Sequence, residues 1–195
     1  MSLVKHIVRV TSGALACICF LAAWIPVQVE TAGPEFESFA VRSGEIGNSN
    51  IKSTPKILKI SGINLNAVIT PVGVDKDNAF DVPSSDLVGW YQYGSSPGSF
   101  GSTVLAAHVD YAGVEGIFFN LQKVKVGQTI TIETELGYTE YKVSAVKSYE
   151  KTGLPINELF TKSGPEKLQL ITCDGEFDKI DRSYKNNLVV TAIPV

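Results

Sequence analysis

The chain from residue 55 onward consists of short apolar or alternating segments separated by turn residues. In the run 129–135, threonine and glutamate alternate with Ile130 and Ile132, which is the two-residue period of a half-buried β-strand. Leu136 and Gly137 separate two such runs and predict a hairpin. The predicted strands are 57–60, 67–72, 103–109, 129–135, 138–149, 168–172 and 188–193, with weaker ones near 80–82 and 88–91.

Helical patterns are rare in the same region. Only 117–124 and the short run 156–160, which follows Pro155, have helical character. Many short strands with few helices are typical of an all-β barrel or sandwich. The sequence therefore predicts one β-domain over residues 55–195.

A basic and then apolar segment precedes this domain. Lysine and arginine come before an apolar run at 10–29, which just reaches the roughly 20 residues of a membrane-spanning helix. A cleaved signal peptide is the alternative, but the small residues at 31–33 are followed directly by Pro34, a poor context for cleavage. We therefore expect residues 1–30 to be a retained signal-anchor. Basic residues before such a helix stay in the cytoplasm, so the bulk of the chain is expected outside.

The segment between the anchor and the β-domain, residues 31–54, is rich in Gly, Ser, Glu and Asn and shows little periodicity. This composition is typical of a flexible linker. We expect it to hold the domain away from the membrane.

Composition and charge limit the possible functions. The chain has 195 residues, 44% of them hydrophobic and 19% charged, which is enough apolar material for a folded core. A net charge of -3 does not suggest the basic face of a nucleic-acid-binding protein. Of three cysteines and two histidines, the part after residue 30 keeps Cys173 and His108. One cysteine cannot form an internal disulfide, and this pair alone cannot hold zinc.

No metal or cofactor site is predicted. Three aspartates lie close together within 75–81, but Ala79 and Phe80 occupy the positions where an EF-hand calcium loop has Asp or Asn and then Gly. The segment 75–78 is better interpreted as a turn between strands. The sequence has no glycine-rich phosphate-binding loop.

Three residues could together carry out acyl transfer through a thiol. Cys173 and His108 each end an apolar strand, and Arg182 follows the predicted loop 174–181. Singly, each has an ordinary explanation: a packed thiol, a structural or surface histidine, a solvated ion pair. Together, an imidazolium or guanidinium promotes the thiolate, and a guanidinium can bind a developing oxyanion. Asp110 could orient the imidazole ring.

The residues around these positions resemble the sortase family. The run Leu170-Ile171-Thr172-Cys173, with Arg182 nine residues on, is similar to the TLxTC…R signature of that family. The run Ala106-Ala107-His108-Val109-Asp110 is similar to its histidine segment. Gln169 and Ala107 depart from the pattern, which usually has Thr and Gly there.

The resemblance covers roughly residues 55–195, with the motifs in the family's order. The stretches 88–110 and 173–184 are most similar to class F sortases. The resemblance implies an eight-stranded sortase-type β-barrel with one or two short helices, preceded by the membrane helix and linker. It also implies a transpeptidase anchored in the membrane, outside a Gram-positive-type cell.

By matching positions, the resemblance implies that Cys173 is the nucleophile and His108 the general acid/base. Arg182 would bind the substrate carbonyl and stabilise the oxyanion. Thr172 and Asp110 are expected to contribute to substrate binding.

The same resemblance implies the substrates. An LPXTG-like C-terminal sorting signal would be cut after Thr, leaving a thioester on the cysteine. An amine from a peptidoglycan precursor or a pilin lysine would then resolve the thioester, without a cofactor.

Two other classes of protein remain open at this point. An L,D-transpeptidase-like enzyme also uses Cys and His outside the cell, although the Ser/His-Gly-Cys-Arg surroundings of such enzymes are absent around Cys173. A non-catalytic surface β-barrel module, in which Cys173 is only packed, is the other alternative.

Overall fold

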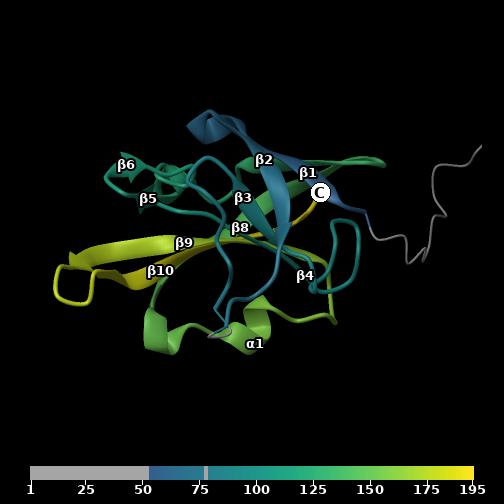
Figure 1. Cartoon of the computed structure of the whole chain (residues 1–195). Coiled ribbons are helices and arrows are strands. Elements are labelled where there is room, and N and C mark those ends of the chain that lie inside the picture. The colour runs from purple at the N-terminus through teal and green to yellow at the C-terminus, as the bar shows by residue number, and fades with distance from the viewer. Residues whose placement is uncertain (1–52, 77–78) are drawn as a thin grey trace, which may run out of the picture. The chain divides into compact units, whose positions relative to one another are not determined.

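The computed structural model describes residues 53–76 and 79–195. Within them, eight strands close into a barrel in the order β1-β2-β3-β4-β9-β10-β8-β7 (Figure 1). Their bounds are β1 Pro55–Ile60, β2 Leu65–Val72, β3 Val88–Tyr91, β4 Ser102–Ala106, β7 Thr129–Thr134, β8 Gly137–Glu150, β9 Lys167–Asp178 and β10 Ser183–Pro194. The predicted eight-stranded, all-β barrel is thereby confirmed.

Shorter elements connect the barrel strands. β5 (Asp110–Tyr111) and β6 (Val114–Glu115) pair with each other in a separate two-stranded sheet. The helical elements are the 3-10 turns η1 (Ser61–Ile63), η2 (Leu121–Lys123) and η3 (Lys151–Gly153), and the α-helix α1 (Ile156–Leu159). The short helix predicted at 156–160 is therefore present.

The helix predicted at 117–124 is wrong, because only the turn η2 forms there. Phe118 and Leu121 are fully buried, and the amide of Leu121 donates to the carbonyl of Phe118, three residues earlier. The amide of Phe118 donates to His108 across the fold instead of to its own segment. The apolar residues that predicted a helix are therefore buried by contacts with other segments and not along one face of a helix.

The predicted membrane anchor at 1–30 and linker residues 31–52 lie outside the described residues. In 53–76 and 79–195, no helix is both long and apolar enough to span a bilayer.

The barrel interior is filled by the apolar positions of the alternating strands. Leu58 and Ile60 of β1 and Ile130 and Ile132 of β7 are fully buried, as the two-residue period requires. The two strands are paired antiparallel, with Leu58 opposite Ile132. The hairpin predicted at Leu136 and Gly137 joins β7 to β8, since Thr134 pairs with Gly137.

Two strand pairs in the barrel are parallel, β2 with β3 and β4 with β9. In the second pair, Ala106 lies opposite Ile171. β4 therefore ends beside the middle of β9, and the predicted catalytic residues His108 and Cys173 each lie two residues beyond this last pair.

The loop predicted at 174–181 is mostly strand. β9 continues to Asp178 and pairs with β10 beyond the cysteine. Asp174 pairs with Asn186 and Phe177 with Tyr184, so two residues of β9 oppose one of β10 between these pairs. Such a β-bulge uses a glycine with positive φ, and Gly175 has φ 80°. The Asp-Gly pair after Cys173 thus forms a bulge and not the end of the strand.

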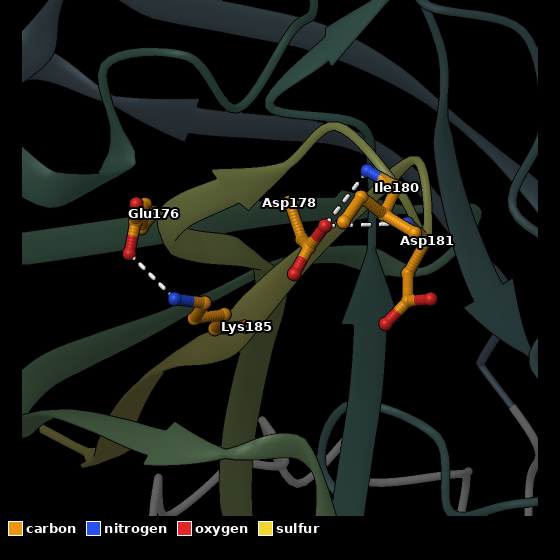
Figure 2. A network of polar contacts seen from close by, with 5 residues as sticks. All are labelled: Glu176, Asp178, Ile180, Asp181 and Lys185. Carbon is orange, nitrogen blue, oxygen red and sulfur yellow. Dashed lines mark hydrogen bonds and ion pairs between the residues drawn. The ribbon is translucent and has the colours of Figure 1, made fainter.

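The true turn of this hairpin follows Asp178. Its carboxylate accepts hydrogen bonds from the backbone amides of Ile180 at 2.8 Å and Asp181 at 3.2 Å (Figure 2). These bonds lower the pKa of Asp178. Beside the turn, Lys185 forms an ion pair with Glu176 at 2.6 Å between the two strands. Figure 1 shows the β9–β10 ribbon, in yellow, extending beyond its neighbouring strands to this turn.

Candidate active site

Cys173 and His108 lie next to each other at one edge of the barrel. The parallel register of β4 and β9 ends at the pair Ala106–Ile171, two residues before His108 and Cys173, and both of these residues line the same cavity. Both residues are partly exposed. The thiol and the imidazole that the sequence singled out are thus neighbours, although 65 positions separate them in the chain.

Two backbone contacts fix this arrangement. The Thr172 hydroxyl donates a buried hydrogen bond of 2.8 Å to the carbonyl of Ala107, which joins the residues that precede the cysteine and the histidine. The amide of Phe118 donates to the carbonyl of His108 at 3.1 Å. Gly116 packs against that same carbonyl so closely that a Cβ there would lie 2.3 Å from the oxygen. The backbone at His108 is therefore held from two sides.

An apolar cavity of about 580 Å³ opens at Cys173 and His108. Its walls include an aromatic cluster in which the Tyr91 ring packs edge-on against Phe160, with centroids 5.4 Å apart, and Phe80 lies beside both. The cavity can take apolar side chains of a peptide and present a carbonyl to the thiol.

Burial has the largest effect on the pKa values of Cys173 and His108. It raises the pKa of the Cys173 thiol, and the negative charge of Asp110 acts in the same direction. The ammonium of Lys151 opposes them by favouring the thiolate. For His108, burial lowers the pKa, while Asp110 and a hydrogen bond to the backbone of Pro83 partly offset this. Both groups are therefore mainly neutral at neutral pH.

Asp110 begins β5, two residues after the histidine. Its carboxylate accepts a hydrogen bond of 2.5 Å from the Tyr184 hydroxyl on β10, which raises the pKa of Tyr184 to about 12. The ring of the next residue, Tyr111, lies 5.0 Å from that of His108 between centroids. The segment after the histidine is thus tied to the strand beside the cysteine.

Arg182 is not brought to this site in the structure. It lies in the turn of the β9–β10 hairpin with φ 49°, and it is exposed. The turn begins five residues beyond Cys173 on β9, roughly 16 Å along a strand. Within the described residues its guanidinium makes no ion pair, and its role remains a prediction from the sequence.

The other two predicted substrate-binding residues have structural partners. Thr172 reaches both the apolar cavity and the space on the other side of Cys173, but its hydroxyl is used by Ala107. Asp110 is bound to Tyr184. The departures from the family pattern are internal: Ala107 is buried, and Gln169 accepts a hydrogen bond of 2.7 Å from Thr191 on β10.

Sequence reasoning missed Lys151 and Tyr184. Lys151 follows β8 and donates to the Ser183 hydroxyl at 2.5 Å. Lys151 is far from Cys173 and His108 in the sequence, and the pairing of β10 with both β8 and β9 brings it to the site. Tyr184 lies within the stretch 173–184, but the sequence pattern gave no sign of its contact with Asp110.

Solved structures of the same fold come from pilus and related sortases. The chain resembles sortase C1 of pilus island 1 from GBS, with a TM-score of 0.55, 24% identity, and 71% of this chain and 64% of that chain covered. It also resembles sortase C1 from Streptococcus suis, with a TM-score of 0.58, 23% identity and coverage of 74% and 73%. For sortase C from Clostridium perfringens SM101 the TM-score is 0.55 at 22% identity, with coverage of 72% and 69%. This chain thus spans less than two thirds of the first of these proteins.

No curated protein matches the chain. A family model does, however: the model described as "Sortase domain" matches residues 58–195, which is most of the chain and contains the whole site. This protein belongs to the sortase family.

Proposed function

We propose that this protein is a cysteine transpeptidase that cleaves an LPXTG-like C-terminal sorting signal and transfers the cleaved protein to an amine. One observation carries the proposal: Cys173 on β9 and His108, two residues after the end of β4, both line an apolar cavity of about 580 Å³. Membership in the sortase family supports the same reaction.

The cavity fits the apolar part of such a signal. Phe80, Tyr91 and Phe160 provide aromatic faces on which a leucine and a proline of a sorting peptide can pack. Their burial would position the threonine carbonyl at the Cys173 sulfur.

The proposed reaction has two steps that share one proton. His108 accepts the proton of the Cys173 thiol, and the thiolate attacks the carbonyl carbon of threonine. The tetrahedral intermediate collapses when His108 donates that proton to the leaving amine, which breaks the peptide bond and leaves a thioester. An acceptor amine then attacks the thioester, a new amide forms, and the thiol is restored.

Stabilisation of the oxyanion is assigned to Arg182 by the resemblance to the family. For this to occur, the end of the β9–β10 hairpin has to fold toward Cys173, because the turn lies several residues beyond it on β9. Lys151 is the cation that already acts on the Cys173 thiol. We propose Arg182 as the residue recruited when the peptide binds.

The remaining parts of the proposal are the compartment, the subclass and the acceptor. We propose an extracytoplasmic domain on a single membrane anchor at residues 1–30, in a Gram-positive-type cell, and a class F enzyme. The acceptor is an amine of a peptidoglycan precursor or a pilin lysine. One similar structure is that of a sortase from a pilus island, which favours testing pilin acceptors as well as cell-wall acceptors.

A fluorescence-quenched LPXTG-like peptide tests the proposal. The full chain, purified in detergent, is expected to cleave the peptide. An added amine should compete with water for the thioester, so that amide forms in place of the hydrolysis product. Cys173→Ala and His108→Ala are expected to lose nearly all cleavage, while Tyr138→Phe, on an exposed strand position, keeps it. Cleavage by Cys173→Ala at the wild-type rate would rule the proposal out.

A further inference from the structure

A second cavity reaches Cys173 from another set of elements. It has a volume of about 160 Å³ and is bounded by β9, β10 and the segment around η2. Cys173 and Thr172 line both this cavity and the larger apolar one, so the thiol lies where the two spaces meet. We propose that the smaller cavity admits the acceptor amine as a cation, with Asp174 as the residue that recruits it. This inference rests on the proposed transpeptidase function.

Position supports this assignment. After the first step, the acyl group bound to Cys173 occupies the apolar cavity, so the acceptor must approach the thioester through space that the peptide leaves open. The smaller cavity also has Cys173 in its wall, together with Phe118, whose amide is bonded to the His108 carbonyl. An acceptor there lies beside Cys173 and next to Val109, the residue that follows the proposed base.

Charge supports it as well. The polar side chains that line the cavity are those of Gln122, Thr172, Asp174 and Tyr184, and the Tyr184 hydroxyl is bound to Asp110. Among the described lining residues there is no Lys, Arg or His. Asp174 is therefore the one charged side chain in the described lining, and the Asp110 carboxylate is bonded to a second lining residue, Tyr184. The Lys151 ammonium acts on the Cys173 thiol but is not part of this lining. The charge of the lining favours an ammonium and disfavours an anionic acceptor.

Size restricts the acceptor further. The apolar cavity is more than three times as large, and the smaller one has room for about five water-sized groups, taking about 30 Å³ for each. This suits a primary amine on a short or unbranched aliphatic chain. A lysine side chain or the amino end of a glycine fits this description.

The second step balances in protons as follows. The ammonium bound near Asp174 releases one proton to solvent and becomes a free amine. The amine nitrogen attacks the thioester carbonyl carbon and the carbon–sulfur bond breaks. The second proton, lost as the amide forms, passes to His108, which is neutral after the first step, and from there to the Cys173 thiolate.

The test compares two acceptors through the ratio of amide product to hydrolysis product. Both products arise from the same thioester, so a change in the first step does not alter the ratio. Cadaverine is a cation and hydroxylamine is neutral at pH 7.5. In Asp174→Asn, the half-saturating concentration of cadaverine should rise about tenfold, because one charge-assisted hydrogen bond is lost. The half-saturating concentration of hydroxylamine should stay within about twofold of the wild-type value.

Asp181→Asn is the matched control, because it makes the same change of charge on the same hairpin but outside the cavity. It should keep the wild-type value for both acceptors. An unchanged cadaverine value in Asp174→Asn, or an equal rise for both acceptors, would overturn the inference.

A second measurement does not depend on peptide cleavage. Methanethiosulfonate reagents that carry a trimethylammonium or a sulfonate group modify the Cys173 thiol directly. We expect the wild type to react faster with the cation, and Asp174→Asn to lose most of this preference. If the wild type prefers the cationic reagent but cleaves no peptide, the proposed function fails while the acidic cavity stands. If it cleaves the peptide but shows no preference between the reagents, the proposed function stands and the inference about the cavity is overturned.

Discussion

The Tyr184 hydroxyl on β10 donates a hydrogen bond of 2.5 Å to Asp110, two residues after His108. Because β10 also pairs with the strand that carries Cys173, this bond connects the backbones of the two proposed catalytic residues. It lies at the surface and does not contribute to the barrel core. We infer that it positions the site and contributes little to stability.

Tyr184→Phe tests this role. Loss of the bond releases the segment after His108, and we expect kcat/KM to fall about fivefold, the effect of about 1 kcal/mol in the barrier. The melting temperature should change little because the pair is exposed. Tyr138→Phe, on the exposed part of β8, provides the control. An equal loss of activity in both variants would argue against a positioning role.

Gly116→Ala tests the contact behind the histidine. The added Cβ would lie 2.3 Å from the His108 carbonyl oxygen, so the backbone at His108 has to move. We expect kcat/KM to fall by more than tenfold while the far-ultraviolet circular dichroism spectrum of the barrel persists. Gly153→Ala is the matched control, since a Cβ there meets nothing within 4 Å. Full activity in Gly116→Ala would show that the close contact does not position the histidine.

The hydroxyl of Thr172 is expected to stabilise the edge where β4 ends beside β9. In Thr172→Val the buried carbonyl of Ala107 loses its hydrogen bond, at a cost of about 1–3 kcal/mol. Thermal unfolding should show a melting temperature several degrees lower, whereas Thr172→Ser keeps the donor and should recover most of the difference. If the two variants unfold at the same temperature, the hydrogen bond is not what stabilises this edge.

Burial determines the expected pH dependence of catalysis. It lowers the pKa of His108 from its ordinary 6.5 and raises that of the Cys173 thiol from its ordinary 9.0. The neutral pair and the reactive ion pair hold the same number of protons, so kcat/KM stays level between the two pKa values. It falls when His108 gains a proton in acid or when the pair loses one in alkali. We expect the acid limb below pH 6.5 and the alkaline limb above pH 9.0. A narrow bell inside this window would contradict the assignment.

Lys151 is expected to hold the thiol pKa down. Removing its charge in Lys151→Met leaves burial and Asp110 unopposed, so the pKa of Cys173 should rise further. The pH profile of iodoacetamide alkylation should shift to higher pH, and Lys151→Arg should restore it. Lys147→Met serves as the control, because Lys147 is an exposed lysine on β8, the strand that ends just before Lys151. No shift in Lys151→Met would mean that the ammonium does not act on the sulfur.

The two-residue alternation predicted an all-β barrel or sandwich, and the resemblance to sortases narrowed this prediction to an eight-stranded barrel. Ile130 and Ile132 point inward with polar residues between them, and this period survives in the structure. Cys173 and His108 were expected to act together, each at the end of a strand, but β9 continues beyond Cys173 to Asp178. The parallel register of β4 and β9 was not predictable, because register depends on partners far away in the chain.

The region after Cys173 was predicted least well. Asp174 and Gly175 carry a turn signal, yet the positive φ of Gly175 forms a bulge that lets the strand continue. This moves Arg182 to the end of a hairpin. The helix predicted at 117–124 failed for a related reason, since Phe118 is buried by contacts with the segment around His108 and not along a helix.

The central claim is that Cys173 forms a thioester with the cleaved peptide, and intact mass spectrometry tests it most directly. The full chain is mixed with an LPXTG-like peptide and quenched in acid. We predict an added mass equal to the peptide up to its threonine, located on Cys173, removed by hydroxylamine and absent from Cys173→Ala. Peptide cleavage that proceeds with no adduct on Cys173, or an adduct that persists in Cys173→Ala, would contradict the account.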